Sequence, residues 1–171
     1  MTVIRRHSIP VSIFLVCLFQ AYVASQAVEQ LSVADALASA RMRMADSYTL
    51  EQLKAMTVES VTAELTEEER LALGTAHIHF DVNVPARVYV LHDKRFGEEV
   101  PSEPFWIQER GFEKTGLEVH CDGDIFVAYA RDFEAGRVGL GVNSFSGNYL
   151  HYFIAVKPVQ EGDTLEITNL A

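Results

Sequence analysis

The chain has 171 residues, of which 49% are apolar and 22% charged, and its 24 acidic residues against 14 basic ones give a net charge of −10 at neutral pH. The length fits one domain of ordinary size, and the apolar content is sufficient for one core. The acidic balance excludes a nucleic-acid-binding protein, because phosphate neutralisation requires clustered Lys and Arg side chains.

The first segment, residues 1–27, predicts a secretory signal peptide. Two arginines and a histidine precede an apolar run over residues 9–23, and small residues follow as far as Ala27, where we expect cleavage. The run is shorter than the roughly 20 residues of a membrane span, so we expect no transmembrane anchor after cleavage. The expected product is exported, periplasmic or extracellular, and keeps 12 basic residues against 24 acidic ones, a net charge of −12. It keeps one cysteine, Cys121, which cannot close an intramolecular disulfide.

Residues 28–74 predict a helical lead-in made of several short helices. Over residues 32–45 the apolar side chains recur at the spacing of one helix face. Helix-start signals, in which a Ser or Thr stands three residues before an acidic or amide side chain, occur at Ser32, Thr49 and Thr66. Gly74 is typical of a helix end. We expect these helices to pack on their own domain.

At Thr75 the apolar period changes from about 3.6 residues to 2. Residues 76–82 alternate between apolar and polar side chains, which predicts a half-buried strand with one face in water. Further strand-like runs follow, separated by turn residues, and residues 164–168 form either one more strand or the start of a linker. Roughly six to eight short strands predict a mainly β protein, in which residues 75–171 form an antiparallel β-sandwich of immunoglobulin-like or fibronectin-like character.

Residues 124–143 predict the central element of this sandwich, a β-hairpin. An apolar run long enough for a strand buried on both faces precedes a turn at residues 134–136. In the second arm Val138 and Leu140 point to one side, whereas Gly139 and Gly141 point to the other. We expect the first face to pack in the core and the second to admit close approach by neighbouring groups.

His77, His79 and Asp81 are candidate metal ligands. Alternate residues of a strand share a face, so two imidazoles and a carboxylate would lie together there. Such a set suits Zn²⁺ or another divalent cation. The alternative interpretation is the solvated face of a strand whose other face lies in the core.

Trp106 and Phe105 are candidate ligand-binding residues. Flat aromatic side chains stack on sugar rings, so the pair indicates a carbohydrate or cell-surface binding module. The alternative interpretation is an aromatic plug at the end of the sandwich core.

Several short motifs occur in the order found in one known family: Pro104-Phe105-Trp106-Ile107, Glu109-Arg110-Gly111-Phe112, Arg131-Asp132-Phe133 and Leu140-Gly141-Val142-Asn143. Through these motifs residues 66–156 resemble the N-terminal β-sandwich domain, purple acid phosphatase-type and fibronectin III-like, of bacterial calcineurin-like metallophosphoesterases. The resemblance implies an exported accessory domain whose partner is a phosphoesterase catalytic domain, in the same chain or in another one.

The catalytic half of that family binds two metal ions through Asp-x-His, Gly-Asp, Gly-Asn-His and His-x-His segments, in that order. Here only Gly123-Asp124 and His77-Ile78-His79 match, in reversed order, and no Asn-His pair occurs. The resemblance therefore implies a chain that is noncatalytic on its own and holds no cofactor. A carbohydrate or cell-surface binding module stays the alternative function.

Overall fold

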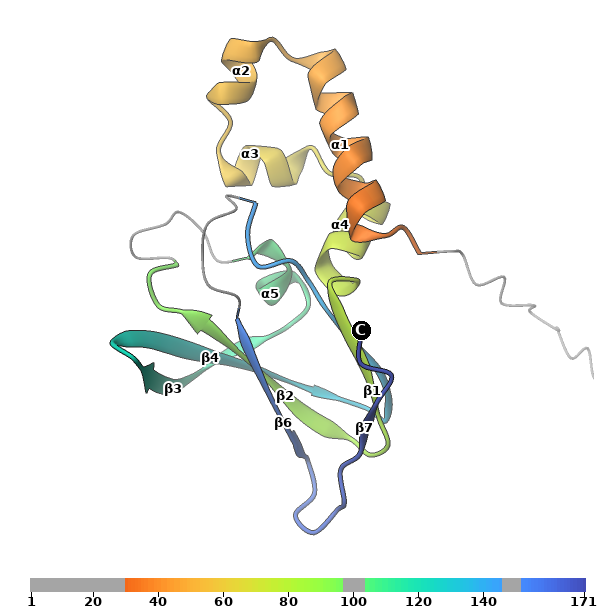
Figure 1. The fold of residues 1–171 in the computed structure, drawn as a ribbon, viewed down its shortest axis with the longest axis vertical. Coiled ribbons are helices and arrows are strands. Elements are labelled where there is room, and N and C mark those ends of the chain that lie inside the picture. The colour runs from red at the N-terminus through yellow and green to blue at the C-terminus, as the bar shows by residue number, and fades with distance from the viewer. Residues whose placement is uncertain (1–29, 97–103, 146–151) are drawn as a thin grey trace, which may run out of the picture.

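The computed structural model describes residues 30–96, 104–145 and 152–171, and Figure 1 shows their helices and strands. The predicted signal peptide lies outside the described residues. Among the described residues, the helices before the first strand are α1 (Val33–Ser47), α2 (Leu50–Lys54), α3 (Val58–Ala63) and α4 (Glu67–Thr75). The elements that follow are β1 (Ile78–Val82), β2 (Ala86–Asp93), α5 (Phe105–Glu109), β3 (Glu113–Cys121), β4 (Asp124–Phe133), β5 (Gly136–Leu140), β6 (Phe153–Pro158) and β7 (Ile167–Thr168).

Serine and threonine side chains begin the first four helices. The Ser32 hydroxyl accepts a backbone N–H of the first turn of α1, and Thr49 and Thr66 form full capping boxes, as the sequence predicts. A further box begins α3 at Thr57, where Ser60 takes the place that Glu or Gln usually occupies. Helices α1 and α4 then pack through a small apolar core made of Ala36, Ala40, Met44, Leu65, Ala72 and Leu73.

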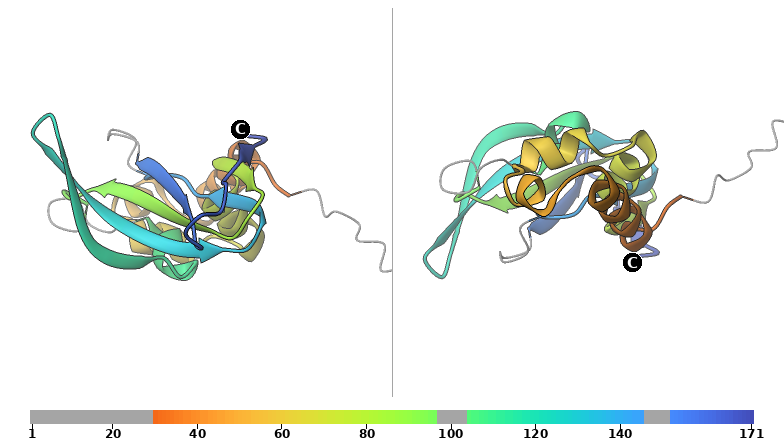
Figure 2. Two further views of the ribbon diagram at one scale, coloured as in Figure 1. Left: turned by 90° about the horizontal axis from the view of Figure 1, so that it is seen from below. Right: turned by 90° about the horizontal axis from the view of Figure 1, so that it is seen from above.

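The strands form two antiparallel sheets, in the orders β5-β1-β7 and β3-β4-β2-β6. The sheets face each other around one core, to which α5 adds Trp106 and Ile107 (Figures 1 and 2). The strand residues of this core are Phe80, Val82, Ala86, Val88, Val90, Val127, Tyr129, Val138 and Leu140. The arrangement confirms the predicted mainly β fold, an antiparallel sandwich with short N-terminal helices.

The predicted hairpin between β4 and β5 is wrong, although the two strands adjoin in the chain. β4 pairs with β2 on one edge and with β3 on the other, whereas β5 pairs with β1 in the opposite sheet. Because both edges of β4 are occupied, residues 134–135 take the chain across to the other sheet. The hairpin that forms is β3–β4, whose turn residues Asp122 and Gly123 have φ angles of 49° and 91°, as a type I′ turn requires.

The two faces of β5 differ as predicted. Val138 and Leu140 are fully buried in the sandwich core. On the opposite face a Cβ atom at Gly139 would overlap the carbonyl oxygen of Thr75, and a Cβ atom at Gly141 would lie 2.5 Å from Cδ1 of Trp106. Glycine therefore allows this strand to lie against the end of α4 and against α5.

We expect Gly141→Ala to lower the free energy of unfolding by about 1–3 kcal/mol, because the added methyl group displaces the Trp106 ring or the backbone of Leu73. Urea unfolding measures this change. Gly123→Asn is the control, since no atom lies within 4 Å of a Cβ there and Asn tolerates positive φ. Equal losses in the two variants would show that the close approach at Gly141 is unimportant.

One buried carboxylate joins α1 to α4. Glu69 is 2% exposed, and its two oxygens each accept a 2.7 Å hydrogen bond from the Arg43 guanidinium. Its Oε2 atom also accepts the backbone N–H of Thr66 at 2.9 Å. The hydrogen bonds from Arg43 outweigh the opposing effect of burial and lower the pKa of Glu69 from 4.5 to about 2. The ionised form of Glu69 therefore stabilises the contact between the two helices.

The depressed pKa of Glu69 makes part of the stability depend on pH. The contribution of Glu69 is complete above its unfolded pKa of 4.5 and is lost as the pH falls toward 2. We expect Glu69→Gln to lower the free energy of unfolding by about 1–3 kcal/mol at pH 7, and by progressively less below pH 4.5. Urea titrations at a series of pH values measure both effects. Glu67→Gln, exposed on the same helix, is the control, and a deficit that stays constant down to pH 3 would contradict the expectation.

Candidate functional site

The candidate metal ligands lie on or beside β1. The backbone of His79 exchanges hydrogen bonds of 2.9 and 3.0 Å with Ala171, and the Asp81 carboxylate accepts a 2.7 Å bond from the side-chain amide of Asn169. The C-terminal segment thus lies along β1. Across the described residues, no group of three or more His, Cys, Asp and Glu side chains is placed to hold a metal ion. The metal site at His77, His79 and Asp81 therefore stays a prediction from the alternation of β1.

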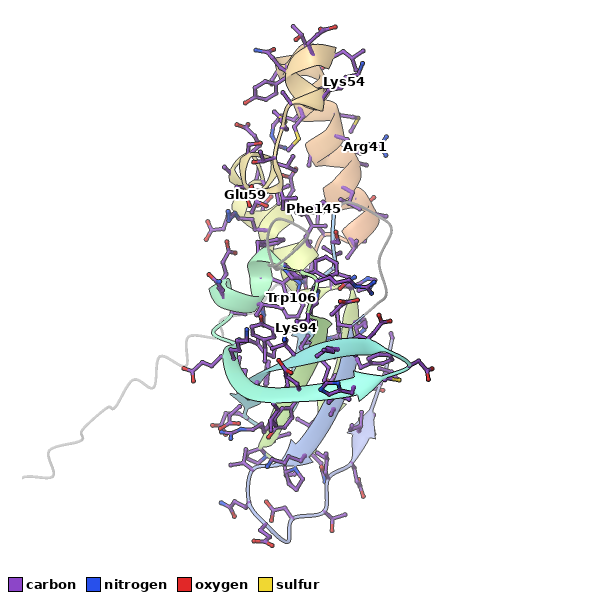
Figure 3. The ribbon with its side chains drawn as sticks, turned by 90° about the vertical axis from the view of Figure 1, so that its left-hand side faces the viewer. Arg41, Lys54, Glu59, Lys94, Trp106 and Phe145 are labelled. Atoms are coloured by element: carbon purple, nitrogen blue, oxygen red, sulfur yellow. The ribbon has the colours of Figure 1, made fainter. Side chains whose placement is uncertain are left out.

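Trp106, a predicted ligand-binding residue, is fully buried. Its indole N–H donates a 2.8 Å hydrogen bond to the carbonyl oxygen of Val142, and its ring packs edge-on against Phe112 with 5.6 Å between centroids. Figure 3 shows Trp106 where the helices meet the sheets. A sugar cannot reach either face of this ring. The alternative interpretation, a plug of the core, is the one that holds.

Phe105 is half-buried and already contacted on its ring. It stacks on Phe145 with 5.9 Å between centroids, and the Arg70 guanidinium lies 5.8 Å from its centroid. The two aromatic candidates therefore form no open platform, and the carbohydrate-binding alternative loses the residues on which it depended.

A junction forms where α4, α5 and the end of β5 meet. The backbone N–H of Val142 donates to the carbonyl oxygen of Leu73 at 2.8 Å, and the Tyr152 hydroxyl donates to the carbonyl oxygen of Gly141 at 2.8 Å. Burial raises the pKa of the Tyr152 hydroxyl, so it stays a neutral donor over the physiological range. With the Trp106 bond, three hydrogen bonds hold adjacent peptide groups at this junction. These three bonds fix the position of α5 and of the residues that follow it.

A polar hollow of about 460 Å³ lies at the start of β3, beside β4. Arg87 and Asp132, which are opposite each other on β2 and β4, form a two-bond ion pair on one side of it, with distances of 2.6 and 2.7 Å. The Arg87 guanidinium holds the pKa of the Asp132 carboxyl below its usual range. Arg131 and Lys114 also line the hollow. Charged side chains therefore gather here, and the sequence showed no motif for them because they come from three different strands.

β3 is an exposed edge strand of the four-stranded sheet. All nine of its residues are exposed, and among the described residues the sheet order leaves one edge of the strand unpaired. Leu117 and Val119 are 57% and 43% exposed, and the pairing register shifts between Lys114 and Glu118, next to Gly116 with φ +79°. Figure 2 shows the β3–β4 hairpin reaching beyond the body of the molecule. Backbone donors and acceptors on such an edge are available to another strand.

Comparison with known proteins finds no matching family model, no matching curated protein and no matching solved structure. The class of protein is therefore defined by its fold, an antiparallel β-sandwich, and by the two surfaces above. No helix in the described ranges is both long enough and apolar enough to cross a membrane.

The burial of the single tryptophan gives a direct spectroscopic expectation. We expect the emission of native Trp106 to be blue-shifted, weakly quenched by acrylamide and unchanged by mono- and oligosaccharides, because the ring is 0% exposed. Urea-unfolded protein is the internal reference for the exposed ring. Strong quenching in the native state, or a saturable change on adding a sugar, would contradict the buried position.

Proposed function

We propose that this chain is an exported, noncatalytic accessory β-sandwich domain that binds a metallophosphoesterase catalytic domain, in the same polypeptide or in another one. The likeness of residues 66–156 to the sandwich domains of purple acid phosphatase-type enzymes supports the identity of the partner. The signal-like pattern of residues 1–27 supports export. The observation that carries the binding function is the uncovered edge of β3.

This edge favours association for two physical reasons. Its unpaired N–H and C=O groups offer main-chain hydrogen bonds to a strand of the partner. The exposed side chains of Leu117 and Val119 supply apolar surface, whose burial contributes about 25 cal/mol per Å². Glu113, Lys114 and Glu118 border these two residues and provide a polar rim.

The strand behind the edge is firmly held. β4 pairs with β3 on one side and with β2 over eight residue pairs on the other, and Phe126, Val127, Ala128 and Tyr129 of β4 are buried. Because β3 rests on this buried strand, its outer edge is formed before a partner arrives. Binding then requires little rearrangement of the sandwich.

Mass spectrometry of the protein isolated from its native source tests the association. We expect peptides of this chain either in one polypeptide with a catalytic domain that carries the two-metal motifs of metallophosphoesterases, or in a stable complex with such a domain. A mature chain of residues 28–171 that is isolated alone, and that binds no such domain, would contradict the proposal.

Leu117→Lys tests how much the outer edge of β3 contributes to binding of the catalytic domain. We expect this change to weaken binding to the catalytic domain about tenfold, equivalent to about 1.4 kcal/mol, because the interface would have to bury an unpaired charge. Calorimetry with two separately produced domains measures the affinity. Val159→Lys is the matched control, since Val159 is 47% exposed and follows β6 at the opposite edge of the same sheet. Equal losses for both variants would exclude β3 as the docking edge.

A further inference from the structure

We propose that the groove between α1 and α2 is a docking site for an amphipathic helix of a partner protein, with acidic side chains along one flank of its apolar face and basic side chains along the other. The inference does not depend on the accessory function above, because the two helices lie apart from β3 (Figure 1). It starts from a helix, α1, that carries apolar side chains on two nearly opposite sides, of which the described residues cover one.

The first apolar side of α1 is used inside the molecule. Ala36, Ala40 and Met44 are buried and pack in the small core that α1 shares with α4. The ion pair between Arg43 and the buried carboxylate of Glu69 holds the same helix to α4. The position of α1 is therefore fixed by the fold itself.

The second apolar side of α1 is uncovered among the described residues. Ala34, Ala38, Met42 and Ala45 follow one another at spacings of three and four residues, so they form a stripe along one side of the helix. All four are exposed, and Met42, the largest of them, is 65% exposed. A surface helix normally turns its polar side chains toward water. An apolar stripe on the water side indicates a surface that a partner covers.

A groove of about 560 Å³ runs along this stripe. Its walls come from α1 and, through Leu53, from α2: Ala38, Arg41, Met42, Met44, Ala45 and Leu53. Side chains spaced by three and four residues form the ridges into which a second helix packs, and alanine allows its axis to come close. Methionine adapts its shape to apolar side chains of a partner. The groove therefore suits a helix laid along α1.

The two flanks of the stripe carry opposite charges. Arg41 lies on one flank, lines the groove and forms no ion pair with a carboxylate of the described residues. Figure 3 shows Arg41 on α1, away from the sheets. Asp46 and Asp35 lie on the other flank, four residues after Met42 and seven before it. A partner helix meets complementary charge when its flank beside Arg41 is acidic and its flank beside Asp46 is basic.

The charge of the whole chain favours a foreign helix over a second copy of this chain. Each copy has a net charge of −10, so two copies repel each other at long range. A partner whose flanks balance acidic and basic side chains meets no such repulsion. The occupant that the groove fits is thus a helix with an apolar face and little net charge.

Titration of the full chain with a synthetic helix tests the groove. The probe is an amphipathic peptide with leucine on one face, glutamate along one flank and lysine along the other. The control peptide has the same composition, with glutamate and lysine mixed on both flanks. We expect saturable binding of the probe below about 1 mM, movement of the Met42 methyl resonance in NMR spectra, and about threefold weaker binding of the control. Absence of probe binding, a stationary Met42 resonance or equal affinities would each overturn the assignment.

Substitutions show whether the stripe and its charge recognise the probe. We expect Met42→Lys to weaken probe binding at least tenfold and to leave the Tm unchanged, because the side chain is exposed. Leu71→Lys, 54% exposed on α4, is its matched control. We expect Arg41→Glu to weaken binding about fivefold, and by less at high salt. Arg137→Glu, exposed on β5, makes the same change in net charge. Equal losses in a variant and its control would overturn the proposal.

Analytical ultracentrifugation of the full chain distinguishes a foreign helix from a second copy. We expect the protein without the probe to sediment as a monomer, and Met42→Lys to leave its sedimentation unchanged. A dimer that dissociates when Met42 is replaced by lysine would show that a second copy fills the groove. That result would overturn the assignment of a foreign helix.

Discussion

The close approach of β5 to the ends of α4 and α5 is the constraint on which the rest of the structure depends. Gly139 of β5 and Gly141 directly after it leave the space that the Thr75 backbone and the Trp106 ring occupy, whereas Val138 and Leu140 bury their side chains in the sandwich. β5 therefore contributes side chains to the sandwich core on one face, and its other face lies against α4 and α5. Hydrogen bonds from Trp106, Tyr152 and the Val142 amide then fix the junction, so helices and sheets form one body.

That junction also determines where the polar surfaces lie. Arg110 follows the buried turn of α5, and the chain continues from there into the exposed strand β3. One anchored segment thus leads into the proposed docking edge. The outer edge of β3 offers backbone groups and two exposed apolar side chains, Leu117 and Val119.

Two arginines of this acidic chain neutralise carboxylates within the fold. Arg43 neutralises a carboxylate that the helices bury, and Arg87 neutralises a neighbour across two strands.

Local patterns in the sequence were sufficient for the N-terminal helices, their starts at Ser32, Thr49 and Thr66, and the two unlike faces of β5, because each depends on residues a few positions apart. They did not predict helix α5. They were insufficient for strand partners, since alternation shows which face is buried and never which edge is paired. The sequence pattern therefore predicts a hairpin of β4 and β5, whereas the hairpin that forms joins β3 and β4. The burial of Trp106 and the pairing of Arg87 with Asp132 were decided by the tertiary structure, because each depends on segments far apart in the chain packing against one another.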